Sequence, residues 1–166
     1  MKTVEKEQFR FQVDLDRTMA YYQSHSVCTC SSCRNLYGQI QVRFAQLTVF
    51  LAEFGVDIFR PDEVAPVEHD GCVDYLFIGY TVTGSILNDG VYETDLGNCH
   101  IKISRGDTPW DSFPNEQTQP HFYITVTGIT LPWTLDEPFP QTKAVVPGKG
   151  FSEKLRGLFR KSGSIQ

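Results

Sequence analysis

The sequence has no long apolar run and no excess of basic charge. No stretch approaches the roughly 18 consecutive apolar residues of a membrane-spanning helix, so we expect no membrane span. The net charge is −5, whereas binding to a phosphate backbone requires a concentrated basic surface. The charged first residues lack the apolar segment of a signal peptide. We therefore expect a cytoplasmic protein that binds no nucleic acid.

Complete catalytic motifs are also missing. A phosphate-binding loop ending at Gly148 and Lys149 would need a glycine five positions before Gly148, where the chain has Lys143. Gly84 and Ser85 lack the surrounding glycines of a nucleophile elbow. Carboxylates and histidines are scattered without a paired arrangement. The sequence therefore favours a protein that is not an enzyme.

Aromatic residues, by contrast, are plentiful, at 13% of the chain with twelve Phe and seven Tyr. They suggest a sheet-rich fold with large side chains in its core. Apolar residues alternate over residues 9–16, which predicts a strand, and Asn88, Asp89 and Gly90 are typical of a hairpin turn. Further strands are predicted at 72–87, 91–93, 99–104 and 121–131. The short connections leave no room for crossover helices, so the sheet should be mostly antiparallel.

One long amphipathic helix is predicted over residues 32–54, starting at Ser31 or Ser32 and ending at Gly55. Its apolar residues recur at spacings of four and three, which is typical of a helix with one buried face. They are Cys33, Tyr37, Ile40, Phe44, Leu47, Leu51 and Phe54. Residues 17–27 show no clear period and are predicted as a loop, with a helical turn as the alternative, and residues 59–71 are predicted as a connecting loop. The expected fold class is α+β, a mostly antiparallel sheet packed on one long amphipathic helix.

The chain is expected to divide into a single α+β domain, residues 1–147, and a basic amphipathic tail, residues 148–166, that is partly disordered. From residue 149 onward, five basic residues and one acid give +4, which leaves −9 on the other 148 residues out of the total of −5. Leu155, Leu158 and Phe159 share one side of this segment. We expect the tail to dock on its own domain or on a second copy.

Three of the five cysteines lie within six positions: Cys28, Cys30 and Cys33. Three interpretations compete. The cysteines could be small buried apolar residues, they could hold a zinc ion with a fourth ligand, or Cys30 and Cys33 could form a redox pair at a helix start. The candidates for the fourth zinc ligand are His25, Cys72, Cys99 and His100. Of these, Cys99 completes the predicted metal site.

The preferred hypothesis is a non-enzymatic cytosolic binding or interaction protein with a structural zinc at the cysteines. The alternative is a thiol-dependent enzyme or redox sensor that uses Cys30 and Cys33. A protein partner or self-association is expected in the first case. Trp110 and Phe113, which belong to a set of aromatic residues next to prolines, are the candidate surface for a ligand or partner.

The cysteine segment also resembles a known group of sequences. Cys28, Cys30 and Cys33 followed by Arg34 and Asn35 form a CxCxxCRN motif at a predicted helix start. The motif, and the segment that follows it to about residue 63, is similar to small bacterial proteins of unassigned function. The resemblance implies no activity and assigns no site residue.

Overall fold

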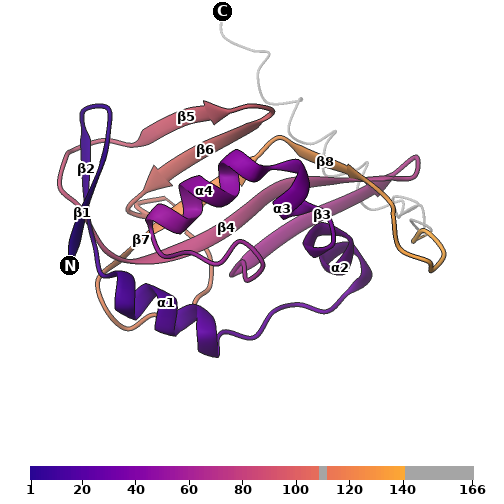
Figure 1. The fold of residues 1–166 in the computed structure, drawn as a ribbon, viewed down its shortest axis with the longest axis horizontal. Helices are drawn as coiled ribbons and strands as arrows, with labels where there is room; N and C mark the ends of the chain where they lie inside the picture. The colour runs from indigo at the N-terminus through magenta and orange to yellow at the C-terminus, as the bar shows by residue number, and fades with distance from the viewer. Residues whose placement is uncertain (109–111, 141–166) are drawn as a thin grey trace, which may run out of the picture.

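The longest strand, β4 (Cys72–Ile86), lies at the centre of the sheet (Figure 1). The computed structural model describes residues 1–108 and 112–140. Within them, eight strands form one sheet in the order β1-β2-β4-β7-β6-β5, with β3 and β8 also paired to β4. Each pairing is antiparallel. The predicted α+β class with a mostly antiparallel sheet is therefore confirmed.

The strands follow the apolar alternation of the sequence. Besides β4, they are β1 (Lys2–Lys6), β2 (Phe9–Val13), β3 (Glu63–His69), β5 (Tyr92–Leu96), β6 (Cys99–Ser104), β7 (His121–Thr127) and β8 (Ile129–Pro132). The first half of β4 pairs with β3 and β8, while β7 and then β2 pair with its second half. A single long strand thus joins the two ends of the sheet.

Two predicted connections are wrong. Residues 59–71 contain β3, which forms a hairpin with β4 through Asp70 and Gly71, both at positive φ (46° and 78°). The Asp-Gly pair is itself a strong hairpin signal. Conversely, Asn88 and Gly90 do not join neighbouring strands, because β4 and β5 are separated in the sheet by β7 and β6. A local turn signal does not determine which strands become neighbours.

The long amphipathic helix predicted over residues 32–54 is also wrong as a continuous element. The chain forms α2 (Ser31–Tyr37), α3 (Ile40–Arg43) and α4 (Ala45–Glu53). At Phe44 the backbone leaves the helical region, with φ −125° and ψ 55°. Asn35 and Gln39 both donate side-chain hydrogen bonds to the Pro132 carbonyl, at 3.1 and 2.9 Å. These contacts fix α2 against the end of β8. The helices α3 and α4 then run in a different direction from α2.

The predicted loop at residues 17–27 is another correction, because most of it lies in α1 (Leu15–Ser24). The Asp14 side chain accepts a hydrogen bond from the Arg17 backbone N–H at 3.1 Å and so caps the helix. Thr18 and Tyr22 are buried, and the Tyr22 hydroxyl donates to the Thr81 carbonyl at 2.8 Å. Polar contacts with β4 hold this helix in place. Such contacts leave no periodic spacing of apolar residues in the sequence, so the helix was not predicted.

The core lies between the sheet and the helices that cross one of its faces (Figure 1). Most of the predicted apolar stripe points inward there, since Ile40, Leu51 and Phe54 are fully buried, whereas Tyr37 and Phe44 are partly buried. Phe11 of β2 packs edge-on against Phe54, with ring centroids 5.5 Å apart. Within residues 1–108 and 112–140, no helix combines the length and apolarity needed to cross a membrane.

Candidate metal centre

The three clustered cysteines converge in space. The Sγ atoms of Cys28, Cys30 and Cys33 all lie within 4.8 Å of one another. Tetrahedral zinc binds thiolate sulfur at about 2.3 Å, which places two such sulfurs about 3.8 Å apart. The sulfurs are therefore close to the separation that a shared zinc ion requires, and three thiolates are a donor set that zinc prefers.

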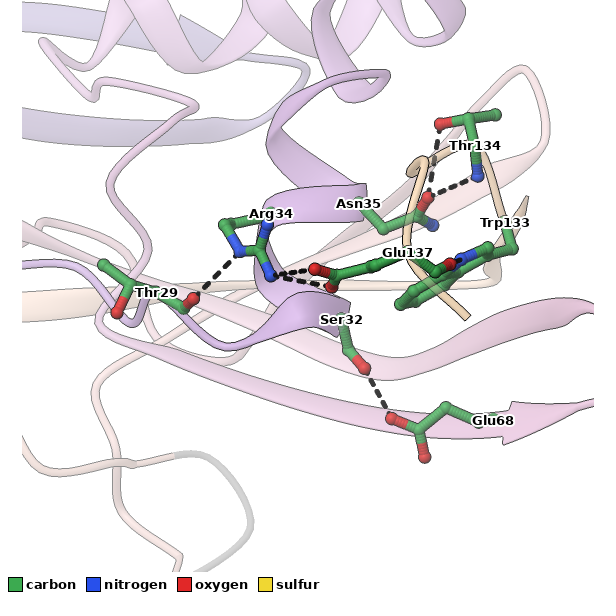
Figure 2. Close-up of polar contacts among 8 residues, drawn as sticks. All are labelled: Thr29, Ser32, Arg34, Asn35, Glu68, Trp133, Thr134 and Glu137. Carbon is green, nitrogen blue, oxygen red and sulfur yellow. Dashed lines mark hydrogen bonds and ion pairs between the residues drawn. The ribbon is translucent and has the colours of Figure 1, made fainter. Parts of the chain in front are cut away.

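The loop before α2 brings these sulfurs together. Cys30 is the residue that precedes α2, with extended backbone angles, and its carbonyl accepts the Arg34 backbone N–H at 2.9 Å. The Arg34 side chain reaches back and donates from Nε to the Thr29 carbonyl at 3.1 Å (Figure 2). Arg34 also forms an ion pair with Glu137 at 2.7 Å. One arginine thus links the cysteine loop, α2 and the segment after β8.

The position of α2 is set by further polar contacts with the sheet. The Ser32 hydroxyl donates to Glu68 on β3 (Figure 2), and the Tyr75 hydroxyl of β4 donates to the Ser32 carbonyl at 2.7 Å. The Asn35 side-chain oxygen accepts the Thr134 backbone N–H at 2.9 Å. Because α2 is anchored at both its first and second turns, the cysteine at its first turn is held against the domain.

The three thiols have different environments. Cys28 and Cys30 are exposed, whereas Cys33 is buried. A hydrogen bond from the Cys30 backbone N–H lowers the pKa of the Cys28 thiol. Burial raises the pKa of the Cys33 thiol, and the neighbouring Cys30 and Cys28 raise it further. The group therefore offers two accessible donors and one buried donor whose charged form is disfavoured.

Tyr37 and Glu63 lie near this group. The Tyr37 hydroxyl is buried and has no hydrogen-bond partner in the described part of the chain. Burial and the neighbouring Cys33 raise the pKa of Tyr37, so its hydroxyl stays neutral. The Glu63 carboxylate is close enough to Cys28 to oppose the effect that lowers the pKa of that thiol. From the sequence, Tyr37 is expected only on the apolar stripe and Glu63 only in a loop, so no pattern associates either residue with the site.

The fourth predicted ligand lies elsewhere. Cys99 is 3% exposed in the hydrophobic core, and its thiol contacts the Leu96 carbonyl at 3.3 Å. Burial raises the pKa of this thiol. Among the residues that the structure describes, no additional Cys, His, Asp or Glu joins the three-sulfur group.

The other candidates for the fourth position are also separate from the group. His100 pairs with Asp95, with Nδ1 and Oδ1 2.8 Å apart, and Cys72 is partly buried on β4. His25 belongs to the same loop as the cysteines. Its Nδ1 is buried without a hydrogen-bond partner in the described chain, and its Nε2 is 3.3 Å from the Pro61 carbonyl.

The predicted aromatic surface is described only in part. Trp110 and the tail at residues 148–166 lie outside the described residues. Phe113 is 9% exposed, and its ring packs edge-on against Tyr123 at 4.9 Å between centroids. A Cβ atom at Gly79 would be 2.5 Å from the Phe113 ring, so the ring fills the space that this glycine leaves open. Phe113 therefore packs inside the domain, against Tyr123 and Gly79, and is not part of an exposed surface.

Comparisons with protein-family models, with curated proteins and with solved structures found no match to this chain. The resemblance to small bacterial proteins with a CxCxxCRN motif therefore stays a prediction.

Proposed function

We propose that this chain is a non-enzymatic binding or interaction protein that holds a zinc ion at Cys28, Cys30 and Cys33. The observation that supports the proposal is the convergence of three sulfurs within 4.8 Å. Three thiols this close repel one another when they ionise, and the burial of Cys33 disfavours its charged form. A divalent cation removes both penalties, because it compensates the charge of the thiolates that bind it.

The proposed site has an open position. A structural zinc has four protein ligands, whereas a site with three protein ligands keeps one position for water or another molecule. The group contains three cysteines within the described residues, and two of them are exposed. The fourth position of the proposed site is filled by water or by a donor from a bound protein. The proposal also requires a reducing compartment such as the cytoplasm, because a disulfide would remove two ligands.

Measuring zinc in the purified protein tests the proposal. The matched variants are Cys30→Ser, which removes a proposed ligand, and Cys72→Ser, which changes a cysteine on β4 outside the group. We expect about one zinc per chain in the wild type and in Cys72→Ser, and loss of most of it in Cys30→Ser. Metal-free wild type, or equal zinc in all three proteins, would contradict the proposal.

A second candidate function, a thiol-dependent enzyme or redox sensor, is supported by the exposure of the cysteines. Cys30 is accessible and Cys33 is buried beside it, as in a pair made of an attacking and a resolving thiol. Alkylation distinguishes the two functions. A zinc site resists alkylation until a chelator is added, whereas a redox pair reacts readily without chelator and forms a reversible disulfide after mild oxidation.

A further inference from the structure

The helix α4 is apolar on two opposite sides. Its inner face carries Leu47, Phe50 and Leu51, all buried. Its outer face carries Ala45, Val49 and Ala52, all exposed. Apolar side chains on a second face of a helix stay exposed to water unless another surface covers them. The outer face is open within the described residues, with Val49 66% exposed and Val42 of α3 85% exposed.

Two hollows adjoin this outer face and share Ala45, Gln46 and Leu96 among their lining residues. The first, of about 480 Å³, extends past Phe44 to Leu131 on β8. The second, of about 470 Å³, extends past Val49 to Lys6 and Glu53. Together they form a continuous depression, mixed in polarity beside Arg43 and Asn98 and apolar along Val49 and Phe50, which we call the α4 groove.

We propose that residues 151–161 of the same chain, which lie outside the described residues, occupy the α4 groove. This segment carries Phe151, Leu155, Leu158 and Phe159 at positions i, i+4, i+7 and i+8. That spacing places four apolar side chains on one helical face. Such a short helix is unstable alone in water, so its order must come from a surface that it contacts.

The length of the connecting chain and its covalent link to the domain favour this segment over a separate molecule as the occupant of the groove. The described chain leaves the sheet through β8, whose Leu131 lines the groove. The fifteen residues that follow Pro140, up to and including Leu155, can span up to about 50 Å, several times the radius of a domain of this size. A tethered segment also binds at an effective concentration of roughly millimolar, far above that of a second copy in dilute solution.

Charge favours the same occupant. The residues from 149 onward carry +4, and the other 148 carry −9. Glu53 lines the groove in an ion pair with Lys6 at 2.7 Å, and Arg43 lies at its other end. The attraction is therefore between the basic segment and the acidic domain as a whole, rather than with the groove lining. The same negative charge on the domain opposes approach to an anionic membrane and to a second copy.

Hydrogen exchange of the full chain, followed by mass spectrometry, tests this docking. The groove variant is Val49→Asp, and the control is Val67→Asp, which changes an exposed valine on β3. We expect amides of residues 151–161 to exchange about tenfold more slowly than in an unstructured chain, both in the wild type and in the control. In Val49→Asp we expect this protection to be lost. Wild-type exchange at the unstructured rate, or equal protection in Val49→Asp, would overturn the proposal.

Two further measurements separate the alternative occupants. Protection that disappears on dilution would place the segment on a second copy, and protection that appears only with anionic vesicles would place it on a membrane. Either result overturns the intramolecular docking. The reciprocal variant, Leu158→Asp, should increase the binding of a dye that reports exposed apolar surface, because it uncovers the groove. Unchanged dye binding in Leu158→Asp would also contradict the proposal.

Discussion

At the residue scale, Gly84 shows how closely β2 approaches β4. Its φ is 150°, and a Cβ atom there would lie 2.0 Å from the Gln12 carbonyl oxygen. Gly71 is also at positive φ, 78°, but a Cβ atom would meet nothing within 4 Å. The two glycines share an unfavourable backbone region for other residues and differ in crowding.

We therefore predict that Gly84→Ala lowers the free energy of unfolding by more than about 3 kcal/mol, because backbone strain and a clash act together. Gly71→Ala should cost only about 1 kcal/mol, the strain alone. Urea unfolding of both variants measures the difference. Equal losses would mean that β2 can move away from β4 without cost.

Because of Tyr75, we predict that the free energy of unfolding depends on pH in the alkaline range. Burial raises its pKa from 10.0 to about 12, and its hydroxyl donates to the Ser32 carbonyl at 2.7 Å. Since the folded pKa exceeds the unfolded one, the stabilisation is complete below about pH 10 and is lost as the pH rises towards 12. In Tyr75→Phe the fall in unfolding free energy over this range should be shallower. Parallel curves for the two proteins would show that Tyr75 does not ionise on unfolding.

At the scale of elements, the divided helix distinguishes two phenylalanines that the sequence places on the same face. Phe54 is fully buried, and its ring contacts Phe50 and Phe122 at 5.4 and 6.2 Å between centroids. Phe44 is only partly buried and lines the α4 groove. We predict that Phe54→Ala costs about 3–5 kcal/mol and Phe44→Ala less than about 2 kcal/mol. Thermal or chemical unfolding measures both, and a larger loss for Phe44→Ala would contradict this placement.

The same elements show how far the fold could be predicted from the sequence. The β-branched run at 72–87 correctly predicted β4, and the alternation in residues 9–16 predicted β2 but extended it past Val13 into the start of α1. Both strands depend on local apolar pattern. The division into α2, α3 and α4 was not predictable from the apolar spacing, which continues through both interruptions. The contacts that Asn35 and Gln39 make with Pro132, far away in the sequence, were not predictable either. The order of the strands was also not predictable, because it depends on contacts between strands that lie far apart in the sequence.

The part of the candidate site that comes from neighbouring residues in the sequence was predictable. The spacing of Cys28, Cys30 and Cys33 is short enough for a single loop to bring the sulfurs together. Cys99 was not predictable as a ligand or as a core residue, because its sequence neighbours do not reveal whether its side chain faces the helices or the cysteine loop. The structure places it in the core.

At the scale of the whole molecule, the cysteine loop connects α1 to α2, and α2 is bound to β3, β4 and the segment after β8. A zinc ion in this loop would bind the folded chain more tightly than the unfolded one. Saturating zinc at about 100 times its dissociation constant would add about 2.7 kcal/mol to the unfolding free energy. We predict that a chelator lowers the melting temperature of the wild type and leaves that of Cys30→Ser unchanged. An equal effect on both proteins would place the metal elsewhere.

X-ray absorption at the zinc edge of the purified full chain tests the central claim most directly, because it measures the number, type and distance of the ligands. We expect three sulfur neighbours at about 2.3 Å and one lighter neighbour or a partner's donor in the fourth position. In Cys30→Ser the sulfur count should fall or the zinc should be absent. Protein without zinc, or zinc surrounded by nitrogen and oxygen alone, would contradict the claim that Cys28, Cys30 and Cys33 form a metal site.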